Sequence, residues 1–257
     1  MMKGIFLLLI SLVISWQGYC QITDKYFNRM NPIIRRHEGF APMAKDYFER
    51  ANSKMEINDY NGAIEDFSKA IEIDPEYAEA FNNKGIAKRM LGDHAGAMED
   101  FTIAVELDPE YAEAYNNRGN TKLDLQNDTG AIEDYTQAIK IDRRLADAYH
   151  NRGLAKKNLN ELDGAIDDFN SAIKLNRKFA DAYNSRGLAK NDLKDYAGAI
   201  DDFTKAIEIF SGYAIAYSNR GIIKITIGQK ESGCLDLNKA AELGNMQAHD
   251  LIRKLCD

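Results

Sequence analysis

A period of 34 residues runs along most of this chain and limits the folds open to it more than any other feature. Glycine recurs at this spacing at Gly85, Gly119, Gly153, Gly187 and Gly221. Small and aromatic columns keep the same register at Ala63, Ala97, Ala131, Ala165 and Ala199 and at Phe67, Phe101, Tyr135, Phe169 and Phe203. A fixed period of this length is typical of repeat proteins, in which each unit packs mainly on its neighbours.

Each unit of the period is predicted to form two helices. Within residues 112–145, Tyr115, Gly119 and Lys122 follow one another at spacings of four and three, which places them on one face of a helix. The alanine and aromatic columns repeat this spacing in the second half of the unit. Turn-prone residues separate the two halves, and the Asp-Pro pairs at 74–75 and 108–109 end the second helix of their units.

The recurring glycines need a physical reason, because glycine inside a helix costs about 1 kcal/mol relative to alanine. Close packing supplies one. We expect Gly119 on the first helix to face the small Ala131 on the second, so that the two backbones approach while aromatic side chains fill the remaining space.

These columns, with Pro75 and Pro109 near the ends of two units, resemble the tetratricopeptide repeat. The resemblance implies an all-α fold, a right-handed superhelical solenoid of six helix-turn-helix repeats with a C-terminal capping helix. The expected repeats are residues 44–77, 78–111, 112–145, 146–179, 180–213 and 214–247. The sixth departs furthest from the pattern, with Gly233 in place of alanine and Leu237 in place of an aromatic residue. Residues 248–257 are expected to form the capping helix, and residues 21–43 a lead-in without repeats.

The first twenty residues have the pattern of an export signal. Lys3 precedes an apolar stretch that is too short to span a bilayer comfortably, and small residues stand at Gly18 and Cys20. We therefore expect a signal peptide over residues 1–20, cleavage before Gln21, no stable membrane insertion, and a periplasmic or secreted location. The alternative is a lipoprotein anchored through Cys20, although Gln17 and Tyr19 fit a lipoprotein signal poorly.

Charge and motif content narrow the class of function. The formal net charge is −7, and an acidic chain repels nucleic acid and anionic membrane surfaces. The histidines are scattered without metal-ligand spacing, and no phosphate loop or nucleophile motif is present. We predict no metal, no cofactor, no small-molecule substrate and no enzymatic activity.

Charged residues recur with the period. Paired acids stand at Glu65-Asp66, Glu99-Asp100, Glu133-Asp134, Asp167-Asp168 and Asp201-Asp202. A catalytic pair need occur only once, so repetition favours solvated surface charges over acid–base chemistry. Two basic columns stand at Arg50, Lys84, Arg118, Arg152, Arg186 and Arg220 and four residues after each. We expect their aliphatic stems to pack on the helices and their charged groups to meet the acids. The alternative is a ladder that recruits an acidic partner.

Asparagine recurs within the first helix of nearly every unit, although it is a poor helix former. Its amide both donates to and accepts from a peptide backbone, and in superhelical members of the resembled family first helices line the concave surface. The candidate partner-binding residues are Asn83, Asn117, Asn151, Asn184 and Asn219. The alternative is that these amides bond only within or between repeats.

Two cysteines remain after the predicted cleavage, Cys234 in the sixth unit and Cys256 in the capping segment. Exported compartments are oxidising, so we predict a disulfide between them. For the whole chain we predict an exported scaffold that binds peptides or proteins along the concave groove. The alternatives are a fixed structural subunit of a cell-envelope or secretion assembly, and an accessory that presents substrates to a separate enzyme.

Overall fold

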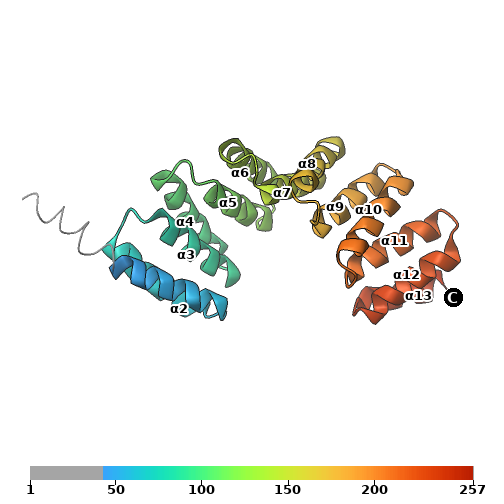
Figure 1. The fold of residues 1–257 in the computed structure, drawn as a ribbon, viewed down its shortest axis with the longest axis horizontal. Coiled ribbons are helices and arrows are strands. Elements are labelled where there is room, and N and C mark those ends of the chain that lie inside the picture. Colours follow the sequence, from blue (N-terminus) through green and yellow to red (C-terminus); the bar gives the residue numbers. More distant parts are fainter. Residues whose placement is uncertain (1–42, 257) are drawn as a thin grey trace, which may run out of the picture. The chain divides into compact units, whose positions relative to one another are not determined.

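The computed structural model describes residues 43–256, and within this range the chain forms helices and no strand (Figure 1). This confirms the all-α fold of helix-turn-helix repeats. The first helix covers residues 43–56. The others are α2 (Tyr60–Ile73), α3 (Ala78–Met90), α4 (His94–Leu107), α5 (Ala112–Asp124), α6 (Asp128–Ile141), α7 (Ala146–Asn158), α8 (Leu162–Leu175), α9 (Ala180–Asp192), α10 (Tyr196–Ile209), α11 (Ala214–Thr226), α12 (Lys230–Glu242) and α13 (Met246–Leu255).

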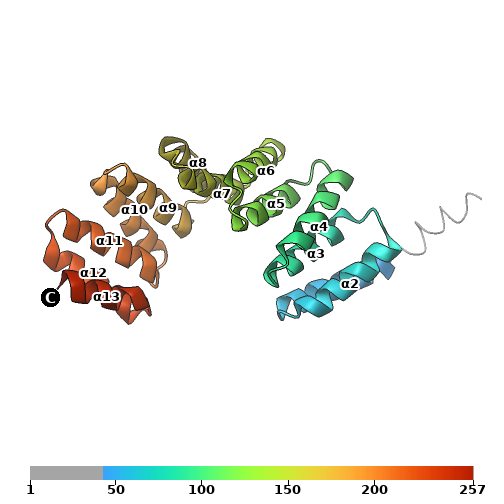
Figure 2. The same cartoon turned by 180° about the vertical axis from the view of Figure 1, so that it is seen from behind.

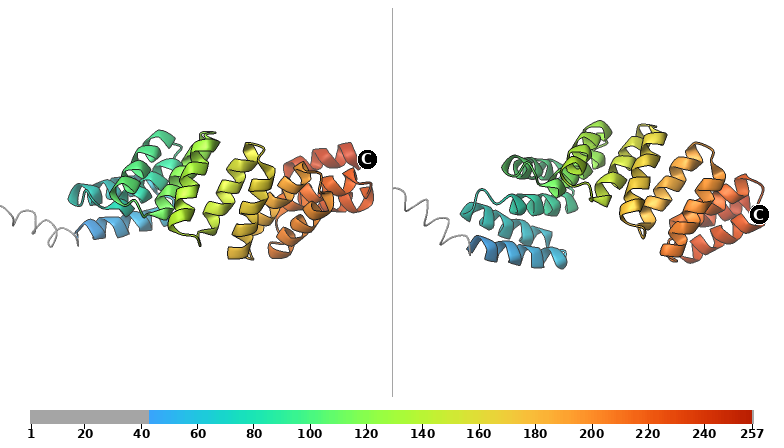
Figure 3. Two further views of the ribbon diagram at one scale, coloured as in Figure 1. Left: turned by 90° about the horizontal axis from the view of Figure 1, so that it is seen from above. Right: turned by 45° about the horizontal axis from the view of Figure 1, so that its top comes forward.

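The chain divides into two compact units, Met1–Gly92 and Asp93–Asp257. The described part of the first unit holds the helix over 43–56, α2 and α3. In the second unit the helices α5–α6, α7–α8, α9–α10 and α11–α12 pack as pairs, and each pair packs on the first helix of the next. The helices of this unit therefore follow one another in space in chain order (Figures 2 and 3).

Polar side chains and left-handed turn residues set the limits of the helices. Asp195 precedes α10, and its Oδ1 accepts a hydrogen bond from the backbone N–H of Gly198 at 3.0 Å. Asp59, Asp93 and Asn127 cap their second helices in the same way. Between α7 and α8 the chain turns at Asn160, whose φ is +62°, a conformation that asparagine tolerates better than most residues.

The predicted inward columns form the core. The side chains of Phe67, Phe101, Tyr135, Phe169 and Phe203 are fully buried, as are the alanines of the matching columns. The predicted neighbour of the glycines was wrong, however. A Cβ added to Gly153 would lie 2.7 Å from Cε1 of Phe169, and one added to Gly119 would lie 2.7 Å from Cε1 of Tyr135. The absent side chain therefore makes room for the aromatic ring rather than for alanine.

The sixth pair packs differently, as its departures from the pattern would suggest. A Cβ on Gly221 would lie 2.8 Å from the carbonyl oxygen of Gly233 and 3.1 Å from Leu237. Here glycine faces glycine across the helix pair, and the two backbones themselves come into contact. The aliphatic Leu237 takes the place of the aromatic ring and is fully buried.

The last helix, α13, buries little of its own surface. Of its residues only Ala248 is buried, while the side chain of Asn245 caps its first turn through the backbone N–H groups of Gln247 and Ala248. A disulfide joins Cys234 on α12 to Cys256, with the Cα atoms 5.8 Å apart. The covalent link therefore holds the end of a helix that buries few of its residues.

The predicted signal peptide, including Cys20, and all but the last residue of the predicted lead-in lie outside the described residues. Among the residues from 43 to 256, no helix is both long and apolar enough to span a bilayer.

Candidate functional site

The first helices of the second unit form a continuous row. α5 contacts α7, α7 contacts α9, and α9 contacts α11, whereas the second helices α6, α8 and α10 make no comparable contact with one another. Adjacent repeats thus approach more closely on the side of the first helices, which makes that side the inside of the curve within this unit. We call α5, α7, α9 and α11 the inner row.

The predicted asparagines occupy this row, apart from Asn83, which lies on α3 in the first unit. Asn117, Asn151 and Asn219 are half-buried on α5, α7 and α11. Asn184 on α9 is buried, with 7% of its surface exposed. The structure therefore brings most of the candidate residues onto one set of neighbouring helices, with part of each half-buried residue accessible.

Hydrogen bonds between repeats hold several of these amides. Asn151 Nδ2 donates to Asn120 Oδ1 at 2.9 Å, and Asn219 Nδ2 donates to Asn184 Oδ1 at 3.1 Å. In the first unit Asn83 Nδ2 donates to Asn52 Oδ1 at 3.0 Å. Bonding between repeats, the alternative to peptide binding, thus accounts for these amide nitrogens. Asn184 in particular faces its neighbour rather than solvent.

His150 belongs to the column one residue before the asparagines, was not among the predicted binding residues, and lies within the row. Its Nε2 lies 3.1 Å from Ser185 Oγ, and its ring centroid lies 4.9 Å from that of Phe179. Burial lowers the pKa of His150 below the usual value of about 6.5, against the opposing effects of Asn151 and Asp181. The signal that identifies such a residue is its column, since Asn82, Asn116 and Asn184 at the equivalent positions are also buried.

In several helix pairs, a buried aspartate on the second helix binds an arginine and a lysine on the first helix. On α7, Arg152 donates from Nε and Nη2 to the two carboxylate oxygens of Asp168 at 2.9 and 2.6 Å, and Lys156 Nζ lies 2.7 Å from Oδ2. Equivalent groups join Arg118 and Lys122 to Asp134, Arg186 and Lys190 to Asp202, and Arg220 and Lys224 to Asp236.

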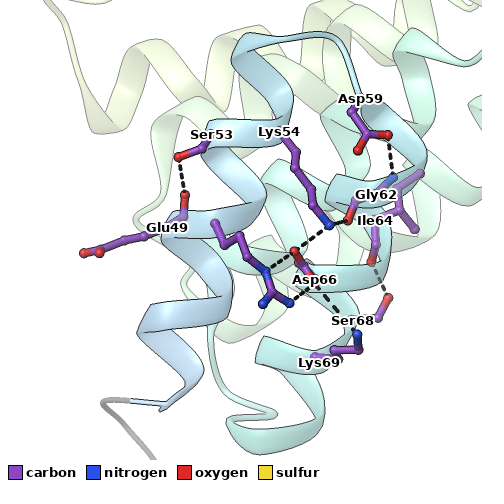
Figure 4. Close-up of polar contacts among 10 residues, drawn as sticks. Glu49, Ser53, Lys54, Asp59, Gly62, Ile64, Asp66, Ser68 and Lys69 are labelled. Atoms are coloured by element: carbon purple, nitrogen blue, oxygen red, sulfur yellow. Dashed lines mark hydrogen bonds and ion pairs between the residues drawn. The ribbon is translucent and has the colours of Figure 1, made fainter.

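The first unit shows the same arrangement. Lys54 Nζ donates to the carbonyl oxygen of Gly62 at 3.1 Å and lies 2.8 Å from Oδ2 of Asp66 (Figure 4). The expectation that the paired acids are solvated is wrong for the second acid of each pair. Asp66 is 1% exposed, because the second helix turns this position toward the cations of the first helix.

Three of these arginines also bond to the preceding repeat. Arg152 Nη1 donates to Thr136 Oγ1 on the preceding second helix at 3.1 Å, and its guanidinium carbon lies 5.7 Å from the centre of the Tyr149 ring. Arg186 and Arg220 make the same inter-repeat bond, to Asn170 and Thr204. One side chain therefore joins two second helices to the first helix between them.

These bonds alter the acidity of the aspartates. The hydrogen bond from Arg50 holds the pKa of Asp66 well below its usual range, against the effect of burial. Burial acts to raise the pKa of Asp236, but the bonds from Arg220 and Lys224 outweigh it and leave that pKa lowered. Both carboxylates therefore stay ionised in the folded protein. They act as structural ion-pair partners and not as acids or bases.

Comparison with known proteins agrees with this architecture. A family model described as "TPR repeat" matches residues 51–92 and 119–160, and models described as "Tetratricopeptide repeat" match residues 78–111, 146–179 and 180–213. Together these matches cover more than half of the chain. No curated protein matches it.

Solved structures of similar fold are numerous. The chain is 30% identical to MamA, with a TM-score of 0.58, over 64% of this chain and 96% of that one. It is 23% identical to YrrB, described as "a TPR protein with an unusual peptide-binding site", with a TM-score of 0.59 over 74% and 98% of the two chains. It is 15% identical to pilF of Pseudomonas aeruginosa, with a TM-score of 0.74 over 84% and 100%.

The last two identities show a shared fold alone. The matched ranges contain the glycine, alanine and aromatic columns that the structure buries between its helices. The chain belongs to the tetratricopeptide repeat family.

Proposed function

We propose that this protein is an exported scaffold that binds an extended segment of another polypeptide along the inner row. Membership of the tetratricopeptide repeat family supports a role in protein interaction. That family consists typically of scaffolds rather than enzymes, so we assign the chain no catalytic step and take binding to be its whole activity.

The observation that carries this proposal is the recurrence of half-buried asparagines on neighbouring first helices. The bond that Asn151 makes to Asn120 fixes the orientation of its amide before any ligand arrives. A fixed amide binds a peptide backbone with a smaller entropy loss than a mobile one. Hydrogen bonds worth about 0.5–1.5 kcal/mol each, spaced along the row, would give a modest affinity that tolerates many ligand sequences.

The test is the double substitution Asn117→Ala with Asn151→Ala, compared with Asn238→Ala, which removes an exposed amide from α12. A partner recovered by crosslinking from native cell extract should bind the double variant more weakly than the control. Because amide–backbone bonds are uncharged, binding should depend little on salt. Circular dichroism should show the same helix content in all three proteins.

Unchanged affinity in a folded double variant, together with steep salt dependence, would contradict binding through these amides. Recovery of one partner at fixed stoichiometry would then favour the alternative role, a fixed subunit of an envelope or secretion assembly.

The export part of the proposal rests on the pattern of residues 1–20. Material collected outside the cytoplasm should have the intact mass of a chain that starts at Gln21. Such a chain lacks tryptophan, because Trp16 is the only one in the sequence. A mass that retains Cys20 with attached acyl chains would replace this prediction with the lipoprotein alternative.

A further inference from the structure

A cavity of about 420 Å³ opens between the first turn of α11 and the turn that joins α12 to α13. Three apolar side chains line it and remain accessible: Ile215 is 55% exposed, Leu243 is 36% exposed and Met246 is 77% exposed. The other lining residues are Ala214, Gly244, Asn245 and Gln247. No charged side chain is among them, so the cavity suits an uncharged occupant.

The repeats themselves show that the fold does not require an apolar residue at this place. Glu113, Asp147 and Asp181 stand at the position of Ile215 in the three preceding first helices, and all three are exposed. At the previous junction the hydroxyl of Tyr213 donates to Asp181 at 2.5 Å. One repeat later, Ile215 takes the place of Asp181 and Gln247 takes the place of Tyr213. Both of these residues line the cavity.

Along the inner row from α5 to α11, one position of the first helix changes from a polar to an apolar residue. The position held by Asn120 on α5 is Leu154 on α7, Leu188 on α9 and Ile222 on α11, and all four side chains are half-buried. Ile222 and Ile215 lie seven residues apart, two helical turns on one face of α11. Ile215, which lines the cavity, therefore lies on the same face of α11 as Ile222.

We infer that this cavity is an anchoring site for one large uncharged side chain, aliphatic or aromatic, of the polypeptide that lies on the inner row. The inference rests on the proposed function and adds to it the orientation in which the ligand lies along the inner row. The ligand lies with its polar part over α5 and α7 and its anchor beyond α11. The volume falls within the usual range for pockets that take small ligands.

A peptide-display selection tests this anchor with defined probes. Random ten-residue peptides are selected on the wild-type chain and on Ile215→Asp, which restores the acid of the preceding repeats and should therefore fold. Leu235→Asp is the matched control, because Leu235 is an exposed apolar residue on α12 that does not line the cavity. Peptides selected on the wild type and on the control should carry a leucine, isoleucine or phenylalanine near one end.

Synthetic copies of a selected peptide then give the magnitude. Replacing its anchor by serine should weaken binding to the wild type and to Leu235→Asp by about tenfold, as expected for removal of a buried aliphatic side chain. The same replacement should change binding to Ile215→Asp by less than about twofold. An equal loss in all three proteins, or selected peptides without an apolar end, would overturn the inference.

Two further results separate the possible failures. If wild-type chains form a dimer in sedimentation that Ile215→Asp dissociates, the occupant is a second copy and the inference is wrong. If the anchor behaves as expected but Asn117→Ala with Asn151→Ala leaves peptide affinity unchanged, the proposed amide-based binding fails while the anchoring site stands.

Discussion

The buried aspartates show most clearly how a single residue supports this fold. In the sequence, Asp167 and Asp168 look alike, yet the first is exposed and the second is buried. The burial of the second acid could have been predicted from a recurring spacing. An arginine is followed by a lysine four residues later and by an aspartate sixteen residues after the arginine. This spacing repeats at Arg152, Lys156 and Asp168. Two cations per carboxylate satisfy both oxygens, which a buried charge requires.

Asp236→Asn should lower the free energy of unfolding by about 3–5 kcal/mol near neutral pH, because it leaves Arg220 and Lys224 without their carboxylate. The pKa of Asp236 is lower in the folded protein than the unfolded value of about 4. Its contribution is therefore fully present above about pH 4 and is lost as the pH falls through the folded-state pKa. Urea unfolding at a series of pH values should show the gap between wild type and variant closing in acid.

The control for this substitution is Asp167→Asn, which changes an exposed acid and should alter the unfolding free energy by less than about 0.5 kcal/mol. Similar losses for the two variants, or a gap that widens in acid, would contradict the role assigned to the buried carboxylate.

Within a helix pair, glycine and an aromatic ring set the distance between the two helices. The period identified Gly153 as a contact position, but not its neighbour, because sequence spacing fixes which face a residue occupies and not how far a distant side chain extends across it. Phe169 is fully buried, so its ring has no room to move away from an added methyl group. In the α11–α12 pair, the contact between Gly221 and Gly233 sets the distance between the helices instead.

Gly153→Ala should destabilise the protein by about 1–3 kcal/mol, because the new Cβ would lie 2.7 Å from Cε1 of Phe169. Gly164→Ala is the matched change on α8. Its Cβ would meet Lys156 Cδ at an ordinary 3.4 Å, so the helix preference for alanine should raise stability by up to about 1 kcal/mol. Thermal melts of the two variants should move in opposite directions, and a shared direction would show that the packing argument fails.

For the chain as a whole, the features that repeat with the 34-residue period could be predicted from the sequence. The helix pairs and the buried alanine and aromatic columns follow from spacings of three and four within a period of 34. Features that depend on contacts between columns could not be read in this way. The burial of Asp66, the bonds of Asn151 and the cavity beside Ile215 each depend on which residues of different helices meet. The exception at Ile215 was nevertheless visible as a break in an acidic column.

The disulfide between Cys234 and Cys256 has a consequence for how the chain comes apart. Helices that bury few of their residues detach most readily from a repeat array. α13 is such a helix, and of its residues only Ala248 is buried. When it detaches, the bond to α12 keeps it within reach of its own binding surface, at an effective concentration in the millimolar range. Reattachment is then an intramolecular event, so the disulfide limits how far α13 can separate from α12.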